Sequence, residues 1–334
     1  MQTDIPYGLV GVGYAMHESS LTPEGSAYPN LPVAMEREGL INSVAYSLWL
    51  NDLGANTGNI LFGGIDTGKF VGSLTKIDVL VDENDKYTHF RVPMTWLEAT
   101  SPSGTDILTL PHGTVDVVLD SGTTLSYLPN EMAEKIWLEV GAAYQTVFEM
   151  AVLPCSHTSH PGYFSFGFAG PHGPRINITM DELVIDLTNG HQPTFTSGPY
   201  EGELVCEFGI QNHSTGPYVL GDTFLRSAYV VYDLENHEIG IAATDFNSTD
   251  TNIIAFPSKG AAIPSASASH DHDDPEDEPP LPTSTELTAA EGFQDGDVLD
   301  ESLDSAAARQ TPCIWAGVAV ISALIMSIPS NYGT

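Results

Sequence analysis

The chain has 334 residues, which is enough for two domains. Lysine and arginine number 10 against 44 aspartates and glutamates, and the resulting net charge of −34 argues against nucleic acid or an anionic membrane surface as a partner. Only 16% of the residues are charged, so we expect a β-rich core with an acidic surface, which suits an acidic milieu because protonated carboxylates no longer repel one another.

Apolar segments broken by glycine make up much of residues 1–80. They lie at residues 7–14, 39–50, 60–66 and 70–74. Within them, Gly63-Gly64 is a turn signal and does not belong to the middle of a buried strand.

The most informative stretch of the chain is residues 117–129. Three apolar β-forming residues lead into an aspartate, and a second apolar run follows a short polar turn made of Asp120, Ser121, Gly122, Thr123 and Thr124. A carboxylate at the end of a buried strand suits a tight turn that presents an acid to a cleft. Glycine lets another backbone approach closely, and a threonine hydroxyl can hydrogen-bond the carboxylate and bias its charge state. A solvated turn aspartate is the alternative, and the apolar runs on both sides weaken it.

Three further apolar segments follow in the second half of the chain. Residues 219–221 form an apolar-apolar-glycine element, and residues 229–233 and 239–242 have the composition of strands. Taken with the first half, residues 7–242 resemble the pepsin-like aspartic proteases. The turn at Asp120 resembles the active-site turn of their C-terminal lobe, and residues 219–221 resemble the element that lies beside it.

The resemblance extends to the first 80 residues. Residues 7–14 resemble a late strand of the N-terminal lobe, residues 39–50 the helix and strand that follow, and residues 60–74 the hairpin that ends this lobe. It implies an all-β, bilobal fold with a complete C-terminal lobe and a partial N-terminal lobe. We therefore expect a partial N-terminal lobe at 1–80, a C-terminal lobe at 81–256, a spacer at 257–312 and a hydrophobic tail at 313–334.

The activity that the resemblance implies is peptide-bond hydrolysis by two aspartates, one from each lobe. One of them, as a carboxylate, is the general base for a water molecule, and the other, protonated, polarises the peptide carbonyl. The resemblance implies that Asp120 is one of these two aspartates. Ser121 and Thr123 would hold its oxygens, Gly122 would meet the substrate backbone, and Thr124 would border a subsite. No metal or organic cofactor is implied, and the partners would be protein or peptide substrates.

The chain departs from the family pattern because the segment with the first catalytic aspartate is missing before residue 7. Residues 1–5 have neither the basic nor the apolar region of a signal peptide, so we expect a sequence that starts late. Residues 66–68 spell Asp-Thr-Gly, the tripeptide of the first lobe, but Lys69 follows in place of a hydroxyl residue. We interpret Asp66 as a solvated turn residue outside the catalytic site.

Two of the three cysteines, Cys155 and Cys206, lie at positions that resemble the family's C-terminal-lobe disulfide. Such a bond closes a loop of about 50 residues and stabilises the fold by roughly 4 kcal/mol in the chain-entropy model. Two free thiols are the alternative, which secretion disfavours. Secretion is supported by candidate glycosylation sites, which lie at Asn177, Asn212 and Asn247.

The last part of the chain changes in composition. Residues 257–312 are rich in Pro, Ser, Ala and acidic residues, which predicts a disordered spacer. Histidine and aspartate alternate at residues 270–273 and could bind a metal weakly, but no folded scaffold fixes the geometry of the ligands, and we assign no metal site.

Residues 313–328, which include Cys313, carry no charge. They are short for a membrane span, which needs roughly 20 residues, but they fit the cleaved tail of a GPI-anchoring signal with Ser305 as the candidate attachment residue. A short transmembrane anchor is the alternative. We expect an extracellular protein held at the cell surface, on the membrane or the wall, as in the GPI-linked fungal branch of the family.

Three hypotheses of function remain open. The first is a surface-anchored aspartic endopeptidase, monomeric when complete, of which this sequence is a part. The second is a non-catalytic peptide-binding or cell-wall structural protein derived from such a protease. The third is a dimer in which two copies of Asp120 meet, and it is disfavoured because residues 1–80 occupy the face that the partner would need.

Overall fold

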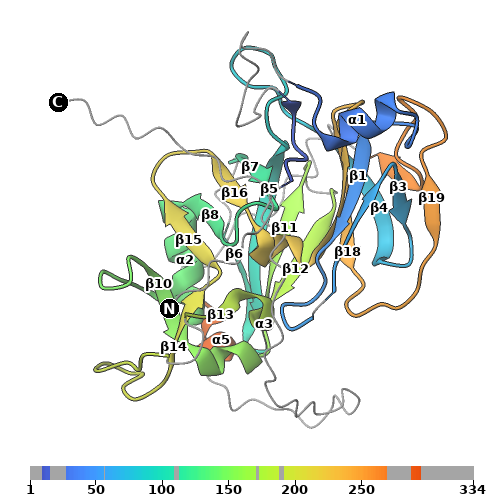
Figure 1. Cartoon of the computed structure of the whole chain (residues 1–334). Coiled ribbons are helices and arrows are strands. Elements are labelled where there is room, and N and C mark those ends of the chain that lie inside the picture. The colour runs from blue at the N-terminus through green and yellow to red at the C-terminus, as the bar shows by residue number, and fades with distance from the viewer. Residues whose placement is uncertain are drawn as a thin grey trace, which may run out of the picture.

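The computed structural model describes residues 10–15, 28–55, 57–108, 113–170, 173–187, 192–268 and 287–294. Strands predominate in these residues, which confirms the all-β class (Figure 1). The helices are short: α1 (Leu31–Arg37), α2 (Asn130–Val140), α3 (Met180–Leu183), α4 (Asp222–Leu225), α5 (Ala290–Gln294) and the 3-10 helix η2 (Cys155–Ser159). None of the helices in the described parts of the chain is long and apolar enough to cross a membrane.

A six-stranded sheet joins an early and a late segment of the described chain. Its order is β2-β1-β17-β18-β4-β20, with the bounds β1 (Ala45–Trp49), β2 (Asn59–Phe62), β4 (Phe70–Asp78), β17 (Ala228–Asp233), β18 (Glu238–Thr244) and β20 (Ala266–Ala268). Every residue of β17 is buried, as expected for a run of β-branched and aromatic residues in the middle of a sheet. Strands that precede and follow residue 80 share this sheet, so the sheet does not test the lobe boundary at residue 80. That boundary stays a prediction.

The two faces of the six-stranded sheet contribute to different cores. Side chains alternate between the faces of a strand, so one set of β1 and β17 residues joins the large core with the rest of the molecule, namely Tyr46, Leu48, Val230 and Tyr232. The alternate set joins a smaller core with Phe256 and Ile263, namely Ala45, Trp49, Tyr229 and Val231. A two-stranded ribbon of β3 (Gly64–Asp66) and β19 (Ile253–Ala255) lies on the side of this smaller core (Figure 1).

An eight-stranded sheet contains the predicted active-site turn. Its order is β12-β11-β5-β7-β16-β8-β15, with β6 paired to β5. The bounds are β5 (Arg91–Ser101), β6 (Gly104–Ile107), β7 (Val115–Leu119), β8 (Ser126–Pro129), β11 (Tyr163–Phe168), β12 (Arg175–Thr179), β15 (Ile210–His213) and β16 (Tyr218–Leu220). A separate four-stranded sheet, β13-β14-β10-β9, consists of β9 (Ala143–Gln145), β10 (Met150–Pro154), β13 (Val184–Asp186) and β14 (Val205–Phe208).

Helix α2 follows β8 directly and covers the end of the eight-stranded sheet. Its apolar residues recur at helical spacing and are buried, namely Met132, Ala133, Ile136, Trp137 and Val140. The helix ends at Gly141, which takes the left-handed conformation with φ +70° that glycine adopts without steric cost.

The structure corrects three expectations about local organisation. Residues 10–15 form no strand, since no described strand pairs with them, although Val12 is buried. The helix expected within 39–50 lies earlier, at α1, where Asn30 caps it by accepting a hydrogen bond from the Val33 amide.

The third correction concerns the predicted disordered spacer at 257–312. Residues 257–268 and 287–294 are structured, because Ile263, Ala289 and Phe293 find apolar partners on the folded lobe and are buried. The acidic segment at 270–273, Ser305 and the tail at 313–334 lie outside the described residues.

Candidate active site

The turn at Asp120 lies where β16 passes between β7 and β8. Strand β16 runs parallel to β7, with Leu220 opposite Leu119, and antiparallel to β8, with Val219 opposite Tyr127. The Asp120 amide donates to the Leu220 carbonyl at 3.1 Å. The two segments that sequence analysis paired, residues 117–129 and 219–221, are therefore neighbours in the sheet.

Glycine is required at position 221. A Cβ atom there would lie 2.3 Å from the carbonyl oxygens of both Thr123 and Leu125, far inside van der Waals contact. The absence of a side chain lets the chain after β16 run directly beneath the turn, where the Asp222 amide donates to the Thr123 carbonyl at 2.8 Å. This close approach is the physical reason for the apolar-apolar-glycine pattern.

The Asp120 carboxylate is held by two donors of its own turn. The Gly122 amide donates to Oδ1 at 2.9 Å, and the Thr123 hydroxyl donates to Oδ2 at 2.7 Å. Burial raises the pKa of Asp120 above its ordinary value, and the hydrogen bonds from Thr123 and Gly122 oppose this rise. Asp120 is thus a partly buried carboxyl group that keeps its proton more readily than a solvated aspartate does.

One expected contact differs from the structure. Ser121 makes no hydrogen bond to Asp120 among the described contacts, and the backbone amide of Gly122 takes the role expected of the serine hydroxyl. The reason is geometric, because in a tight turn the amide two residues after an aspartate points back at its carboxylate. Thr124 is exposed at the outer side of the turn.

A chain of hydroxyl groups supports the turn from below, and sequence analysis missed it. The Gly221 amide donates to the Ser126 hydroxyl at 3.3 Å, and Thr223 donates to the Gly209 carbonyl at 2.9 Å. Because the Thr223 proton is used in this way, Ser126 donates to Thr223 over their 2.9 Å contact. This network connects β8, β16 and α4, and only the packing of three distant segments creates it.

Asp222 is a second carboxyl group near Asp120. Burial raises its pKa to about 7, the Asp120 charge adds to the rise, and Arg226 opposes it. Its Oδ1 is buried without a hydrogen-bond partner among the described residues. The sequence signal for it was its place directly after Gly221.

Two tyrosines lie behind the Asp120 turn. The rings of Tyr46 and Tyr232 stack with centroids 4.8 Å apart, and both are buried. Burial raises the pKa of each, and the charge of Asp120 raises both further. The carboxylate is therefore backed by neutral aromatic side chains from the six-stranded sheet.

Asp66 is not the solvated residue that we expected. It is 6% exposed, and its Oδ1 accepts hydrogen bonds from the amides of Gly68 at 3.0 Å and Asn252 at 2.6 Å. These donors fix the connection between β3 and the segment before β19, on the side of the molecule away from β7 (Figure 1). The burial comes from a partner segment almost 200 residues further along, which local sequence does not reveal.

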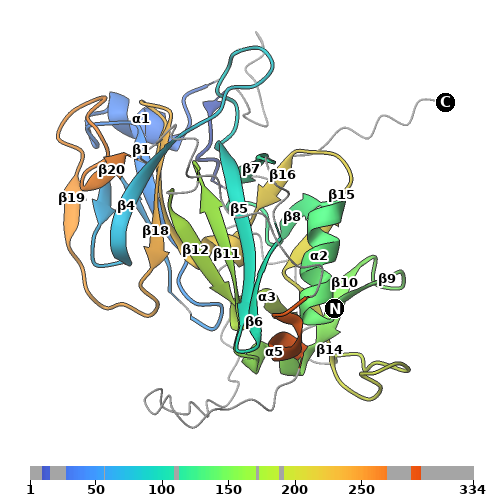
Figure 2. The ribbon, with the colours of Figure 1, turned by 180° about the vertical axis from the view of Figure 1, so that it is seen from behind.

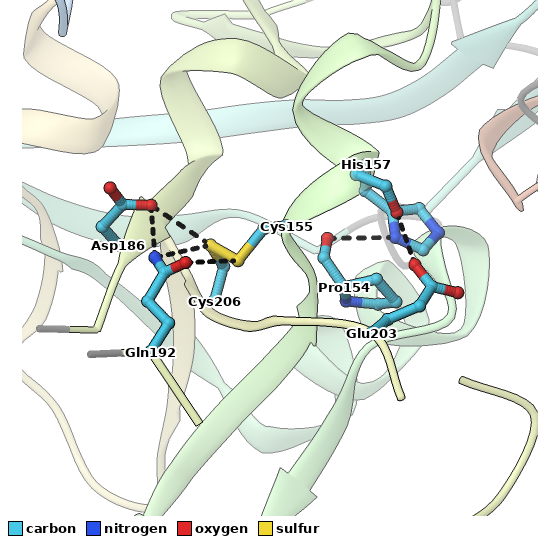
Figure 3. Close-up of a disulfide and its surroundings, with 8 residues drawn as sticks. Pro154, Cys155, His157, Asp186, Gln192, Glu203 and Cys206 are labelled. Atoms are coloured by element: carbon cyan, nitrogen blue, oxygen red, sulfur yellow. Dashed lines mark hydrogen bonds between the residues drawn. A yellow bond between two sulfur atoms is a disulfide. The ribbon is translucent and has the colours of Figure 1, made fainter. Parts of the chain in front are cut away.

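The structure joins Cys155 and Cys206 in a disulfide (Figure 3). The bond lies beside the pairing of β10 with β14, where Leu153 is opposite Cys206. Asp186 lies within 4.8 Å of both sulfurs, and the Gln192 amide nitrogen bridges Asp186 Oδ1 at 2.5 Å and Cys206 Sγ at 3.6 Å. Because the two sulfurs are bonded to each other, this cluster holds no thiolate and is not a metal site.

The three asparagines of the candidate glycosylation sites are accessible to different degrees. Asn177 on β12 and Asn247 are exposed, and Asn212 on β15 is partly exposed. Glycosylation of these residues stays a prediction.

The chain is similar in sequence to known proteins. The family model for eukaryotic aspartyl proteases matches residues 2–244. The chain belongs to this family, of pepsin-like proteases.

Several named relatives come from fungi. The chain is 43% identical over 292 residues to the probable aspartic-type endopeptidase OPSB of Arthroderma benhamiae, covering 86% of this chain and 56% of the relative. It is 40% identical to the probable aspartic-type endopeptidase opsB of Aspergillus fumigatus, over 78% of this chain and 51% of the relative. It is 32% identical to secreted aspartic protease 8 of Candida albicans, over 75% of this chain and 52% of the relative. The chain thus spans about half the length of the relatives that it matches.

Proposed function

We propose that the protein is an aspartic-type endopeptidase in which Asp120 is one of two catalytic carboxyl groups. The observation that carries the proposal is the geometry of the Asp120 carboxylate, partly buried and oriented by Gly122 and Thr123 at the crossing of β7, β16 and β8. The membership of the family and the names of the relatives support the reaction class.

In this reaction one carboxyl group of the pair is ionised and the other protonated. The ionised group takes a proton from a bound water molecule, which attacks the peptide carbonyl, and the protonated group donates to the carbonyl oxygen. The proton is then passed to the leaving amine. Gly122 and Thr123 fix the direction of the Asp120 oxygens, and burial keeps the proton affinity of Asp120 high enough for it to take part in the sharing.

The second carboxyl group would come from a segment that precedes residue 1 in a longer form of the protein. The share of the relatives that the chain spans supports this part of the proposal. Ser121 and Thr124 would border the bound peptide, since both lie at the surface of the turn.

The proposed setting is extracellular, with the protein attached to the cell surface through its C-terminal region and monomeric when complete. The disulfide between Cys155 and Cys206 fits an oxidising compartment, and one relative is named a secreted protease. Attachment at Ser305 and glycans at Asn177, Asn212 and Asn247 belong to the same proposal.

The test is the substitution Asp120→Asn in the longer protein, with Asp78→Asn as the matched control. Asp78 is also an aspartate at a strand end, but its side chain is 83% exposed and, among the described residues, pairs with Lys76. We expect Asp120→Asn to lower kcat by about 10³-fold or more at unchanged thermal stability, because an amide can neither take nor share the proton.

The control variant should keep kcat within about twofold of the parent, as exposed substitutions usually do. Full activity of the Asp120→Asn protein would refute the catalytic assignment. The second candidate, a non-catalytic peptide-binding protein, would be favoured if the unsubstituted longer protein bound peptides at the turn and cleaved none.

A further inference from the structure

Residues 287–294, called the docked segment below, lie against the C-terminal lobe. The residues that they contact there are far away in sequence. Figure 2 shows α5 between α2 and the turn that joins β5 to β6. Ala289 and Phe293 are fully buried, and the Phe293 ring stacks on Phe164 with centroids 5.2 Å apart. A Cβ at position 162 would lie 2.3 Å from the Phe293 ring, so glycine opens the space that the ring fills.

Side chains of the lobe bind the backbone of the docked segment. Ser101 donates to the Ala289 carbonyl at 2.7 Å, and Ser103 donates to the Thr288 carbonyl at 2.6 Å and accepts from the Gly292 amide at 2.9 Å. These contacts come from the turn between β5 and β6. They satisfy polar backbone groups that would otherwise be buried without partners, and this makes the surface specific for the docked segment.

Contacts at the other end come from α2 and from the residue after η2. The Gln294 side chain donates to the carbonyls of Leu138 at 3.0 Å and Glu139 at 3.1 Å. The His160 ring donates to the Phe293 carbonyl. The docked segment is therefore held along its whole length by three different elements.

A pair of carboxyl groups lies beneath the docked segment. Asp106 accepts from the Thr288 hydroxyl at 2.8 Å and from the Ala289 amide at 2.7 Å, so its charge is stabilised by the segment itself. Glu139 faces Asp106, is completely buried, and has no donor within reach of either oxygen among the described residues. Two carboxyl groups can share a hydrogen bond only when one carries a proton, and Glu139 is the one without other donors.

We propose that residues 287–294 are a pH-controlled strap on the C-terminal lobe, held while Glu139 is protonated and loosened when Glu139 ionises beside Asp106. Gln294 and Thr288 place the two ends of this strap over the carboxyl pair, so ionisation acts directly on its contacts.

The direction of the pH dependence follows from linkage. Burial raises the pKa of Glu139 to about 8, and the charge of Asp106 and a hydrogen bond with it add to the rise. When the strap is undocked, the pKa of Glu139 returns toward the ordinary glutamate value of about 4.3. Between these two pKa values Glu139 is protonated in the docked state and ionised in the undocked state. Docking therefore weakens as the pH rises, by up to about tenfold per pH unit, and its pH dependence levels off above pH 8.

Other titratable groups lie on the elements around this contact. They are Arg91 and Glu98 on β5, Tyr127 on β8, His213 on β15, Glu291 on α5, His160 after η2, and Glu131, Glu134 and Lys135 on α2 itself. Within the described chain, the charge that raises the pKa of Glu139 is that of Asp106 and not that of any of these groups.

The test is hydrogen exchange of the chain at pH 5 and pH 8.5, reported as protection factors so that the intrinsic pH dependence of exchange is removed. The amides of Ala289, Gly292 and Phe293 are followed, and those of β17 in the core are the internal reference. We expect protection of the three strap amides to fall more than tenfold from pH 5 to pH 8.5, while the β17 amides change far less.

Three variants separate the explanation from general destabilisation. Glu139→Gln keeps a neutral donor toward Asp106, so protection should stay high at both pH values, whereas Glu131→Gln, on the exposed start of the same helix, should behave like the parent. Phe293→Ala should lose protection at both pH values without affecting β17. Unprotected strap amides at pH 5, equal protection at both pH values in the parent, or an unchanged pH response in Glu139→Gln would each overturn the proposal. None of these readouts depends on peptidase activity.

Discussion

At the scale of the residue, two aspartates with similar local sequence have different surroundings. Asp66 and Asp120 are each followed by a hydroxyl residue and a glycine, and each accepts a hydrogen bond from the amide two residues on. Asp120 receives its second donor from Thr123 in its own turn, and Asp66 receives it from Asn252 in a distant segment. Asp66 therefore links two segments, and Asp120 stands at the crossing of strands.

We predict that Asp66→Asn lowers stability and leaves the proposed chemistry intact. An amide is a weaker acceptor than a carboxylate for the amides of Gly68 and Asn252, so the free energy of unfolding should fall by about 1–3 kcal/mol. Urea unfolding measures this change. In the longer protein, kcat below the melting temperature should fall by less than about tenfold. A loss of kcat as large as that expected for Asp120→Asn would contradict the structural role.

At the scale of the element, the turn depends on the close approach of β16 to the residues after β7. Gly221 permits this approach, and the hydroxyl groups of Ser126 and Thr223 hold it. Gly221 contributes in two ways, because it has no side chain to block the approach and its amide donates a hydrogen bond to the Ser126 hydroxyl.

We predict that Gly221→Ala disrupts this element. Its Cβ would lie 2.3 Å from two carbonyl oxygens that belong to the backbone, so the strands must separate, and we expect a loss of about 3 kcal/mol or more. Thermal unfolding measures the loss. Gly13→Ala is the control, because no atom of the described residues lies within 4 Å of a Cβ there. Equal melting temperatures for the two variants would show that the crossing is looser than described.

In the molecule as a whole, the six-stranded sheet holds together residues 45–78 and residues 228–268. β1 pairs with β2 on one side and with β17, a strand from late in the chain, on the other, and the large core is continuous between the two sheets. The Asp120 turn is thus supported by residues on both sides of it in the chain, including Tyr46 and Tyr232.

We predict that the 334-residue chain alone has no peptidase activity at pH 3–5. The proposed mechanism needs, besides Asp120, the catalytic aspartate that we place before residue 1. Supplying the segment that precedes residue 1, in the same chain or as a separate one, should create activity. Cleavage of a peptide substrate followed by mass spectrometry is the measurement. Cleavage by the isolated chain, lost in Asp120→Asn, would mean that this chain contains the complete catalytic site.

The sequence by itself determined the features that depend on local patterns. The apolar run before Asp120, the polar turn after it and the glycine at 221 predicted the all-β fold and the centre of the candidate site, because strands and tight turns need these residue types at these positions. The bounds of β17 and β18 agree with the predicted segments 229–233 and 239–242 to within about two residues, since β-branched and aromatic runs mark buried strands.

Only the tertiary structure decided what depends on segments that are far apart in sequence. The burial of Asp66 by Asn252, the hydroxyl network under Asp120 and the docking of residues 287–294 on α2 have no local signal. The composition of 257–312 predicted a disordered spacer, yet a few apolar residues in it, Phe293 above all, have a complementary surface on the lobe. Burial and hydrogen bonding at such contacts require two segments that are far apart in sequence, and these segments meet only when the chain folds.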